Sequence, residues 1–430
     1  MASPNTAPDP APDPAGVPAR RAALRLLDAV LRRGQALEAA LDRAAANLPA
    51  NDRGLAHAIA AEVLRFLSEL DALIDSATQR RIPDDAKARF ALRMALAQVI
   101  RLGTPPHAAI ATVLPLVDGG PRKLVHGVFG ALIRRGVTLP DAPALPDATA
   151  LRWEAQYGTA MVEAAMHAIA QPPPIDLTLA DPRTTDHWAQ VLGGTSLMPG
   201  HVRIEPGQGV AALPGFDAGA WWVQDLAASL PARLIGAGAG EALDLCAAPG
   251  GKTLQLAAAG WGVRAIDISG SRLARLRDNL GRTRLSADMI CADLNEWRPA
   301  ASVDAVLLDA PCSATGIFRR HPDVLHRVRP SIIAEAAEVQ RAMLTRAADW
   351  VRPGGVLVYA VCSLERAEGE DQVAAFLARH RHFAIDPARA DELPAGVAPV
   401  ADGAVRTLPG MLAAAGGLDG FFIARMKRTA

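Results

Sequence analysis

The second half of the chain alternates strand-type and helix-type segments, and this pattern constrains the fold more than any other feature. Short apolar segments such as EALDL at 241–245, VRAID at 263–267 and VLVYAV at 356–361 precede amphipathic stretches with helical spacing. Strands that alternate with helices are typical of a parallel doubly wound sheet, so we predict an α/β fold of this type. The terminal segment FFIARMKR at 421–428 is expected to form an edge strand.

The first third of the chain has the apolar spacing of helices throughout. From Ala19 to Arg135, segments with apolar residues at helical spacing are separated by Gly or Pro. The longest run, at 52–78, is predicted to be one amphipathic helix with Asp52 as its N-cap. This part therefore predicts an all-α domain of five or six helices.

Shifts in composition divide the chain into five segments. The Pro/Ala/Asp-rich start is expected to be disordered, and a second Pro/Asp/Ala stretch is expected to be a linker. The mixed region after the linker suits a small α+β subdomain better than a sheet core. The predicted boundaries are a disordered tail at 1–17, a helical domain at 18–137, a linker at 138–150, an α+β subdomain at 151–220 and a doubly wound domain at 221–430.

Charge is unevenly distributed along a chain with 45 basic and 45 acidic residues. Residues 17–140 hold 18 Lys and Arg against 11 Asp and Glu, so this part carries +7 and the remainder −7. A neutral total argues against general coating by nucleic acid, whereas a basic helical part is consistent with local phosphate contact. Solvent-exposed helix faces would explain this uneven charge distribution equally well.

The four cysteines, at positions 246, 291, 312 and 362, show neither CxxC nor CxxH spacing. The spacing therefore predicts no metal site and no disulfide framework. The chain contains no apolar run of 18 residues and does not begin with a basic segment followed by an apolar one. We expect a cytoplasmic monomer with reduced thiols and no membrane contact.

The segment LDLCAAPGGKT at 243–253 is typical of a cofactor loop between a strand and a helix. A phosphate-binding Walker A loop would need glycine at Cys246, and no GxGxxG dinucleotide motif is present. Asp267 ends the next strand, where an acid can bind ribose hydroxyls, and Asp293 follows the third strand near an expected adenine pocket. The set favours an adenosine-bearing ligand without pyrophosphate, namely S-adenosylmethionine.

Cys312 in DAPCSATG and Cys362 in YAVCSLE each follow a predicted strand at the edge where open α/β sheets bind ligands. Carbon 5 of cytosine is a poor nucleophile, but addition of a thiolate to carbon 6 makes it reactive toward a methyl donor. Asp309 is a candidate acid at ring nitrogen 3, and Cys312 a candidate for proton removal from carbon 5 and for release. Methylation of an exocyclic nitrogen would need no thiol, so the cysteine pair favours carbon 5.

Other residues have simpler expected roles. Cys246 and Cys291 are expected to pack as small apolar side chains. Arg319, Arg320 and His321 follow the Pro-Cys motif and are candidates for phosphate contact.

The motifs together resemble the NOL1/NOP2/Sun family of RNA cytosine-5 methyltransferases. DLCAAPGGKT is similar to the family's cofactor motif, DAPCSATG to its Pro-Cys motif and YAVCSLERAEGEDQV to its second cysteine motif. VQDLAAS, RRHPD and the terminal DGFFIARMKR also look like family segments. The helical part resembles the NusB-like RNA-binding domain of bacterial members, so the likeness covers nearly everything after the tail.

The resemblance implies a class I methyltransferase domain with a Rossmann-like sheet and assigns roles by position. It makes Cys362 the nucleophile and Cys312 the releasing thiol. In DNA cytosine-5 methyltransferases the Pro-Cys thiol is the nucleophile, so this assignment rests on the family. Val361 stands where many members have Thr. The implied cofactor contacts are Cys246, Ala247, Ala248, Pro249, Gly250, Gly251, Lys252, Asp267, Asp293 and Asp309.

The function that this resemblance implies is methylation of carbon 5 of a cytidine in 16S ribosomal RNA. Three alternatives stay open: another RNA such as tRNA, DNA methylation through Cys312, and a non-catalytic RNA-binding assembly factor. The intact acid and thiol set argues against the last of these.

Overall fold

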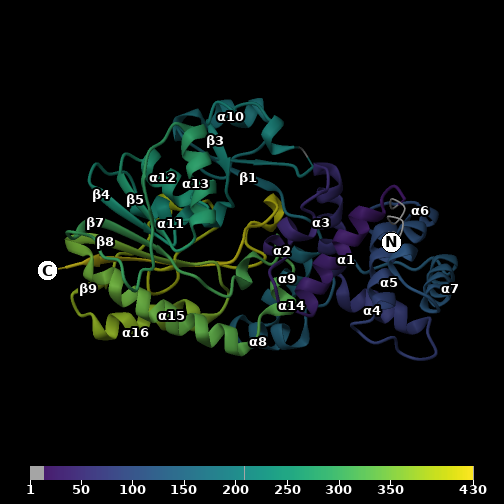
Figure 1. The fold of residues 1–430 in the computed structure, drawn as a ribbon. Helices are drawn as coiled ribbons and strands as arrows, with labels where there is room; N and C mark the ends of the chain where they lie inside the picture. The colour runs from purple at the N-terminus through teal and green to yellow at the C-terminus, as the bar shows by residue number, and fades with distance from the viewer. Residues whose placement is uncertain (1–13, 208, 430) are drawn as a thin grey trace, which may run out of the picture. The chain divides into compact units, whose positions relative to one another are not determined.

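The computed structural model describes residues 14–207 and 209–429, which form two compact units (Figure 1). The first, here called the helical unit, runs to Pro146 and includes His321–Arg327. The second, here called the sheet unit, comprises Asp147–Arg320 and Val328–Ala430. Residues 321–327 were predicted to lie in the doubly wound domain, but their contacts place them in the helical unit.

The helical unit is built on a core of Leu, Ile, Val and Ala side chains, including the fully buried Leu26, Ile59 and Leu92. These side chains recur at helical spacing, so that each helix buries one face in a common core. Its helices are α1 Val17–Leu31, α2 Leu37–Ala44, α3 Ala50–Arg65, α4 Leu67–Ser76, α5 Lys87–Ile100, α6 Pro106–Val113, α7 Pro121–Arg134 and the short α14 Val324–Arg327.

The prediction of one long helix at 52–78 is wrong, because the chain leaves the helical conformation at Phe66 and forms the two helices α3 and α4 instead. Phe66 has φ −116° and ψ 31°, its side chain is buried, and the guanidinium of Arg101 lies 4.5 Å from the centre of its ring. Asp52 lies in the first turn of α3, and Pro49 occupies the N-cap. Residues 1–13 of the predicted tail lie outside the described residues, and Val17 begins α1.

The sheet unit begins with two helices and a small antiparallel sheet. The helices are α8 Asp147–Tyr157 and α9 Thr159–Ile169, so residues 147–150 of the predicted linker are helical. The sheet has the order β2-β1-β3, with Leu177 facing Val202 on one side and Val223 on the other. Its elements are β1 Ile175–Leu179, α10 Thr185–Val191, β2 His201–Ile204 and β3 Trp221–Val223. The boundary predicted at 221 therefore falls inside this subdomain.

A larger sheet with the order β10-β11-β8-β7-β4-β5-β6 forms the centre of the sheet unit, with β9 paired to β11. Strands β4 to β8 are parallel, and β11 runs antiparallel to β8. The strands are β4 Glu241–Leu245, β5 Gly262–Asp267, β6 Asp288–Cys291, β7 Val303–Asp309, β8 Val351–Val361, β9 Phe383–Ile385, β10 Val405–Thr407 and β11 Phe421–Arg428. The prediction of 421–428 as an edge strand is wrong, because β8 pairs with one side of β11 and β10 and β9 with the other.

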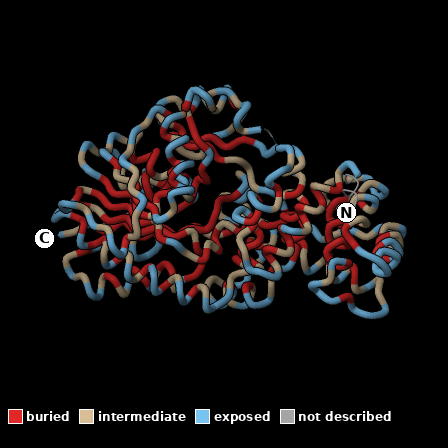
Figure 2. Tube along the Cα trace, viewed as in Figure 1, coloured by how far each residue is buried: buried red, intermediate tan, exposed pale blue. Residues whose placement is uncertain are grey.

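Helices cover both faces of this sheet, as expected for a doubly wound fold (Figure 1). One face packs on α11 and α12 around Ala242, Ala305 and Leu307. The other packs on α15 and α16 around Leu243 and Val306, and the strands between them are buried along most of their length (Figure 2). The helices are α11 Leu226–Ile235, α12 Gly251–Ala258, α13 Gly270–Thr283, α15 Pro330–Asp349 and α16 Glu370–Arg379.

The strand order reverses between β4 and β7. The chain proceeds from β4 outward to β5 and β6, and then returns to add β7 and β8 on the other side. Open α/β sheets bind ligands outside the carboxyl ends of their strands at such a point. The loops after β4, β5, β7 and β8 meet there, and they carry most of the predicted site residues.

Candidate active site

The loop between β4 and α12 makes a tight turn that leaves little space for side chains. Cys246 has a φ of +61°, in the left-handed region that non-glycine residues seldom occupy. Gly250 has a φ of +110°, and a Cβ there would lie 2.2 Å from Leu276 Cδ1 on α13. The sequence therefore needs glycine at 250, where the loop and α13 approach each other closely.

Asp267 ties the loop to the end of β5. Its carboxylate accepts hydrogen bonds from the backbone N–H of Ala248 at 3.1 Å and of Ser269 at 2.9 Å. The Arg272 guanidinium lies 3.5 Å from Oδ2, so Oδ1 is the oxygen with the fewer partners. Asp267 is only 2% exposed, and these contacts show that it shapes the cofactor loop.

A cavity of about 470 Å³ lies beyond β5 and β6, with Asp293 and Glu296 in its wall. Ile268, which is 68% exposed, and Trp297 supply apolar surface to the same wall. Asp293 also accepts a hydrogen bond from the backbone N–H of Asn295 at 2.8 Å. An apolar wall beside acidic acceptors fits the adenosine part of S-adenosylmethionine.

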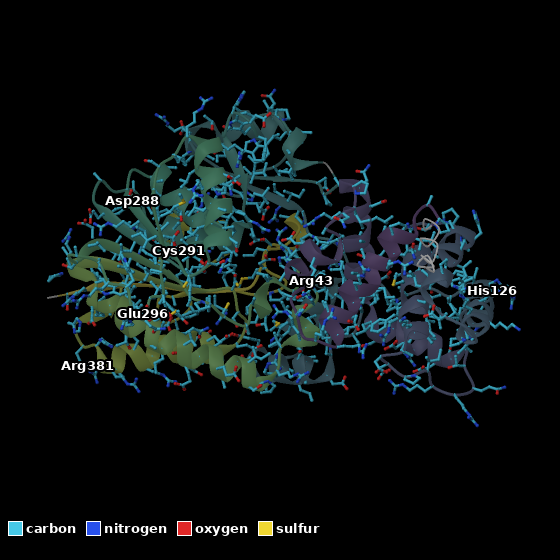
Figure 3. The ribbon with its side chains drawn as sticks, in the orientation of Figure 1. Arg43, His126, Asp288, Cys291, Glu296 and Arg381 are labelled. Carbon is cyan, nitrogen blue, oxygen red and sulfur yellow. The ribbon has the colours of Figure 1, made fainter. Side chains whose placement is uncertain are left out.

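Cys291 was expected to pack in the core, and that prediction is wrong. Its side chain is exposed in the wall of this cavity, near Glu296 (Figure 3). The strand β6 lies at the edge of the sheet, where no further strand covers its last residue. Cys246, by contrast, packs against the apolar core, and burial raises the pKa of its thiol to about 12.

Lys252, in the first turn of α12, pairs with Asp309 at the end of β7. The distance between Lys252 Nζ and Asp309 Oδ2 is 2.7 Å. Burial disfavours the ammonium, but the negative charges of Asp309, Asp244 and Cys362 hold the pKa of Lys252 above its ordinary value. The site therefore holds a partly buried cation that pairs with Asp309 and interacts electrostatically with Cys362.

The structure brings the two predicted thiols into contact. Cys312 Sγ and Cys362 Sγ are 3.4 Å apart, although fifty residues separate them in the chain. The hydrogen bond to Cys362 and burial, together with the negative charges of Cys362 and Glu368, hold the pKa of the Cys312 thiol well above its ordinary value. Cys312 is therefore the sulfur that retains its proton.

The arginines after the Pro-Cys motif do not have the predicted availability to phosphate. Arg319 is 3% exposed and pairs with Asp419 at 3.1 Å. Arg320 pairs with Asp225 at 2.8 Å and with Asp419 at 3.2 Å. These pairs neutralise both guanidinium groups inside the sheet unit, so the prediction of phosphate contact is wrong for them.

Sequence reasoning missed a buried carboxylate, Glu368, that joins the two cysteine loops. It accepts hydrogen bonds from Ser313 and Ser363, the residues that directly follow the two cysteines. The signal was present in the repeated Cys-Ser pair, but a sequence does not show that both serines reach the same carboxylate.

Asp244 was also missed as a structural link. It is fully buried in β4 and accepts a hydrogen bond from Thr253 Oγ1 of α12 at 2.5 Å. Burial raises its pKa to about 7, and hydrogen bonding to Thr253 opposes that rise.

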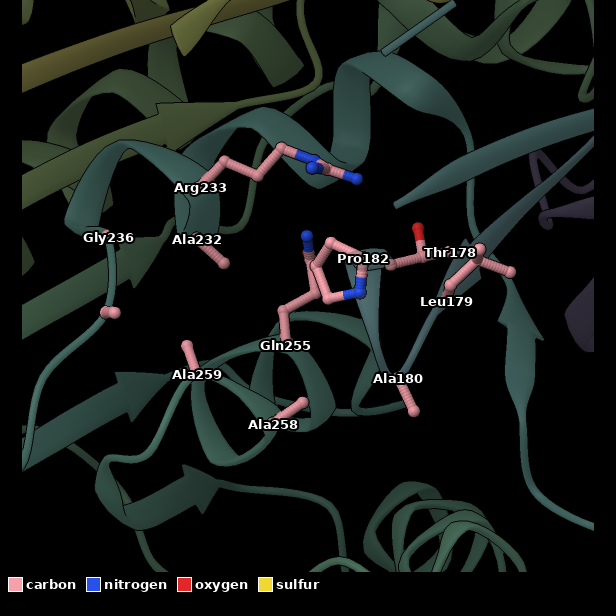
Figure 4. Close-up of a pocket in the computed structure, with 11 residues that line it drawn as sticks. Thr178, Leu179, Ala180, Pro182, Ala232, Arg233, Gly236, Gln255, Ala258 and Ala259 are labelled. Atoms are coloured by element: carbon pink, nitrogen blue, oxygen red, sulfur yellow. The ribbon is translucent and has the colours of Figure 1, made fainter. Parts of the chain in front are cut away.

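A second cavity in the sheet unit, of about 390 Å³, has a different character (Figure 4). It is lined by the ends of α11 and α12 and by β1, including Arg233, Gln255 and Ala259. Arg233 donates to the carbonyls of Pro199 and Gly200, and Gln255 Nε2 donates to that of Ser229. The wall contains neither a thiol nor a carboxylate, so this cavity has no groups for the chemistry described above.

Among residues 14–207 and 209–429, none of the helices combines the length and the apolar character that a membrane span requires. In the same residues, no group of three His, Cys, Asp or Glu side chains is arranged to hold a metal ion.

Several solved structures share this fold. PH0851 superposes with a TM-score of 0.73 at 21% identity, covering 96% of this chain and 99% of that one. NSun6 from Pyrococcus horikoshii, solved with SFG, gives a TM-score of 0.58 at 18% identity, covering 67% and 99%. Identities this low show the fold alone, and they confirm the predicted fold class.

Sequence comparison gives the family. Residues 237–427 match the family described as 16S rRNA methyltransferase RsmB/F, and residues 17–132 match the NusB family. Ribosomal RNA small subunit methyltransferase B of Cronobacter sakazakii is 33% identical, covering 95% of this chain and 98% of that protein. The protein of the same name from Xylella fastidiosa (strain 9a5c) is 35% identical, covering 94% of this chain and 99% of that protein. The chain therefore belongs to the RsmB family of ribosomal RNA small subunit methyltransferases, with a NusB-like domain before the methyltransferase domain.

Proposed function

We propose that this protein methylates carbon 5 of a cytidine in 16S ribosomal RNA through a covalent adduct with Cys362. The observation that carries the proposal is the pair of thiols in contact beside the cofactor loop at the carboxyl edge of the sheet. S-adenosylmethionine, when bound by the loop 246–252 with Asp267 and Asp293, supplies an electrophilic methyl group. The proposal includes a monomer acting in the cytoplasm, where thiols stay reduced.

Electrostatics favours Cys362 as the nucleophile. The charge of the Lys252 ammonium interacts electrostatically with Cys362. Cys312 instead lies within the field of the Glu368 carboxylate, which favours its neutral form. A thiolate attacks far better than a thiol, so we assign the attack on carbon 6 of the base to Cys362 and not to the thiol of Cys312.

Asp309 is the group that we place at ring nitrogen 3. It stands at the end of β7 with Lys252 on one carboxylate oxygen, which leaves the other oxygen available. When the Cys362–carbon 6 bond forms, electron density moves toward nitrogen 3 and carbon 5. A hydrogen bond donated to nitrogen 3 stabilises that charge and so favours the adduct, and Asp309 supplies it when its second oxygen carries a proton.

Formation of the adduct also prepares Cys312 for its own step. Two causes of its raised pKa are the hydrogen bond to Cys362 and the negative charge there. Both disappear once the Cys362 sulfur is bonded to carbon, so the pKa of Cys312 falls and its thiolate becomes available. That thiolate takes the proton from carbon 5 of the methylated base, the carbon 5–carbon 6 double bond re-forms and the bond to Cys362 breaks.

Arginines of α1, of α2 and of the turn between them form the surface of the helical unit that we propose for RNA. Arg25, Arg33 and Arg43 line a cavity of about 520 Å³, and Arg43 is marked in Figure 3. Arg21, Arg25 and Arg43 line a neighbouring one of about 130 Å³. Clustered guanidinium groups around a concave surface suit phosphates, and such binding weakens as salt rises.

The reaction is tested by incubating the protein with tritiated S-adenosylmethionine and unmodified 16S ribosomal RNA, followed by digestion to nucleosides. Label in 5-methylcytidine is expected, and label in any other nucleoside rejects the reaction. tRNA and DNA serve as competing substrates, and preferential labelling of either rejects the proposed substrate.

The RNA surface is tested with the double variant Arg25→Glu/Arg43→Glu. It is expected to raise KM for RNA about tenfold or more and to reduce the salt dependence of binding, because about two phosphate contacts are lost. Arg379→Glu/Arg381→Glu, at exposed positions beside β9, is the matched control. Equal effects of the two double variants would contradict the proposal that the arginine surface at α1 and α2 binds RNA.

A further inference from the structure

The two cysteine loops are joined first through the backbone. Ala310 N–H donates to Ala360 O at 2.9 Å, which continues the β7–β8 ladder to the end of the strands. Gly316 N–H then donates to Cys362 O at 3.0 Å. A Cβ at Gly316 would lie 1.9 Å from Gly420 O, so the close packing of this loop against Gly420 requires glycine at position 316. Between these two bonds lies the segment 311–315, which carries Cys312 and has no ladder partner.

The Glu368 carboxylate supplies the missing connection. Its Oε1 accepts the backbone N–H of Ser313 at 2.8 Å, and its Oε2 accepts Ser313 Oγ–H at 2.5 Å. The same Oε2 accepts the hydroxyl of Ser363, which follows the other cysteine. One carboxylate therefore binds the residue next to each sulfur.

Glu368 is itself held in place from the far side. Gln340 of α15 donates from Nε2 to Glu368 Oε1 at 3.3 Å and to Pro311 O at 2.9 Å. Tyr359 Oη–H donates to the Glu368 carbonyl at 2.6 Å. Thr315 adds a further link, because its Oγ1 accepts Leu364 N–H at 3.0 Å and lies 3.2 Å from Ser363 Oγ.

This carboxylate is costly to bury. Glu368 is 0% exposed, and among the described residues no Lys or Arg side chain forms an ion pair with it. Burial raises its pKa, while its hydrogen bonds to Ser313, Ser363 and Gln340 oppose that rise. An apolar side chain would avoid the cost but would connect neither serine, so the geometry of the loops depends on the carboxylate.

We propose that Glu368 is the positioning residue that holds Cys312 and Cys362 at sulfur contact by binding the serine after each of them. Glu368 touches no reacting atom. It acts through Ser313 and Ser363, which fix the two loops relative to each other. Its expected contribution is to the steps that need both sulfurs, and this part of the inference rests on the proposed function.

Crosslinking of the two sulfurs measures their positioning without any methyl transfer. Diamide takes two electrons and two protons from the two thiols and becomes the corresponding hydrazine, while the sulfurs join in one disulfide. The rate of Cys312–Cys362 bond formation, followed by peptide mass mapping, depends on how often the sulfurs meet. Wild type is expected to crosslink this pair faster than any pair that includes Cys246 or Cys291.

Glu368→Ala is expected to slow this crosslink about tenfold, equivalent to roughly 1.4 kcal/mol of lost positioning. Glu368→Gln keeps an acceptor for the Ser313 N–H, and the serine hydroxyls can rotate toward its amide, so its crosslinking rate is expected to fall by no more than about twofold below that of wild type. Glu365→Gln is the matched control, because Glu365 is equally buried in the same loop but binds Arg152 and Trp153 of α8. Crosslinking of folded Glu368→Ala at the wild-type rate would overturn the proposal.

Circular dichroism shows whether Glu368→Ala folds. If it does not fold, the double variant Ser313→Ala/Ser363→Ala tests the positioning role instead, because it removes both hydroxyl donors and keeps the carboxylate. This double variant is expected to crosslink about threefold more slowly, and a wild-type rate overturns the proposal.

Kinetics separates the two proposals. Glu368→Ala is expected to lower kcat about tenfold or more with KM for RNA and for S-adenosylmethionine little changed, because neither ligand touches it. If wild type makes no 5-methylcytidine but the crosslinking results hold, the proposed function fails and the positioning role stands. If wild type makes 5-methylcytidine but Glu368→Ala crosslinks normally, only the positioning role fails.

Discussion

Two loops of the sheet unit carry the same residue pair, Cys-Ser, but place the sulfur in different surroundings. Cys362 directly follows β8 and shares its site with the Lys252 ammonium. Cys312 lies three residues beyond β7, and the negative charges of Cys362 and Glu368 help to raise the pKa of its thiol. Identical thiols thus have different electrostatic surroundings, one with a cation and the other with a buried carboxylate. The roles that we propose for them rest on this difference in position and not on residue type.

The largest expected effects come from removing each sulfur in turn. Cys362→Ala is expected to lower turnover by at least about 10³-fold, because it removes the sulfur that we propose forms the adduct. Cys312→Ala is expected to form the adduct but resolve it slowly, so a protein–RNA complex accumulates on denaturing gels. The reverse pattern, a trapped complex with Cys362→Ala and none with Cys312→Ala, would exchange the two roles.

Removing the cation of Lys252 is expected to change the reactivity of Cys362 but not that of Cys312. Lys252→Gln should slow alkylation of Cys362 by iodoacetamide at pH 7.5 by up to about tenfold, because the cation that interacts with Cys362 is removed. Alkylation of Cys312 should not slow. Lys123→Gln, a lysine of α7, is the control. Equal slowing at both sulfurs would show that Lys252 supports the loops instead of the charge of Cys362.

Removing the negative charge of Glu368 is expected to make the other sulfur, that of Cys312, more reactive. The Glu368 carboxylate helps to raise the pKa of Cys312, so Glu368→Gln should lower that pKa. Cys312 then becomes reactive toward iodoacetamide at a lower pH than in wild type. The pH profile of Cys312 in Glu365→Gln should match wild type, and an unchanged profile in Glu368→Gln would show that its charge does not act on Cys312.

The smallest expected effect concerns the residue before the nucleophile. Val361 is fully buried in the apolar core, so Val361→Thr places a hydroxyl there and should destabilise the protein by about 1 kcal/mol. We expect kcat to stay within about twofold, because the backbone bond between Gly316 and Cys362 is retained. Urea unfolding gives the free energy of unfolding, and a clear rise in kcat would show that Cys362 is imperfectly placed in this chain.

The fold class was predictable because it depends on local periodicity. Strand-type segments such as 241–245 and 263–267 became β4 and β5, since apolar segments of that length are buried in a sheet with helices on both sides. Strand 421–428 was predictable as a strand but not as an interior one. Its neighbour β10 is only three residues long, which is too short to give a clear sequence pattern.

The break at Phe66 and the fate of Arg319 and Arg320 were not predictable. The helical spacing continues across Phe66, and only the packing of its ring in the core shows why the chain turns there. The two arginines look in the sequence like any basic pair. Their partners Asp225 and Asp419 lie about a hundred residues away on either side, so their burial becomes visible only in three dimensions.

Residue types and their spacing already carry the class of fold, the cofactor loop and the two thiols, because each depends on neighbours in the chain. The 3.4 Å contact between the sulfurs, the ammonium beside one of them and the carboxylate beside the other come from chain folding. Electrostatic forces between side chains depend on distance in space, and fifty residues of intervening chain say nothing about that distance. The proposed reaction therefore uses groups that are visible in the sequence, but the roles that we assign to them depend on their three-dimensional surroundings.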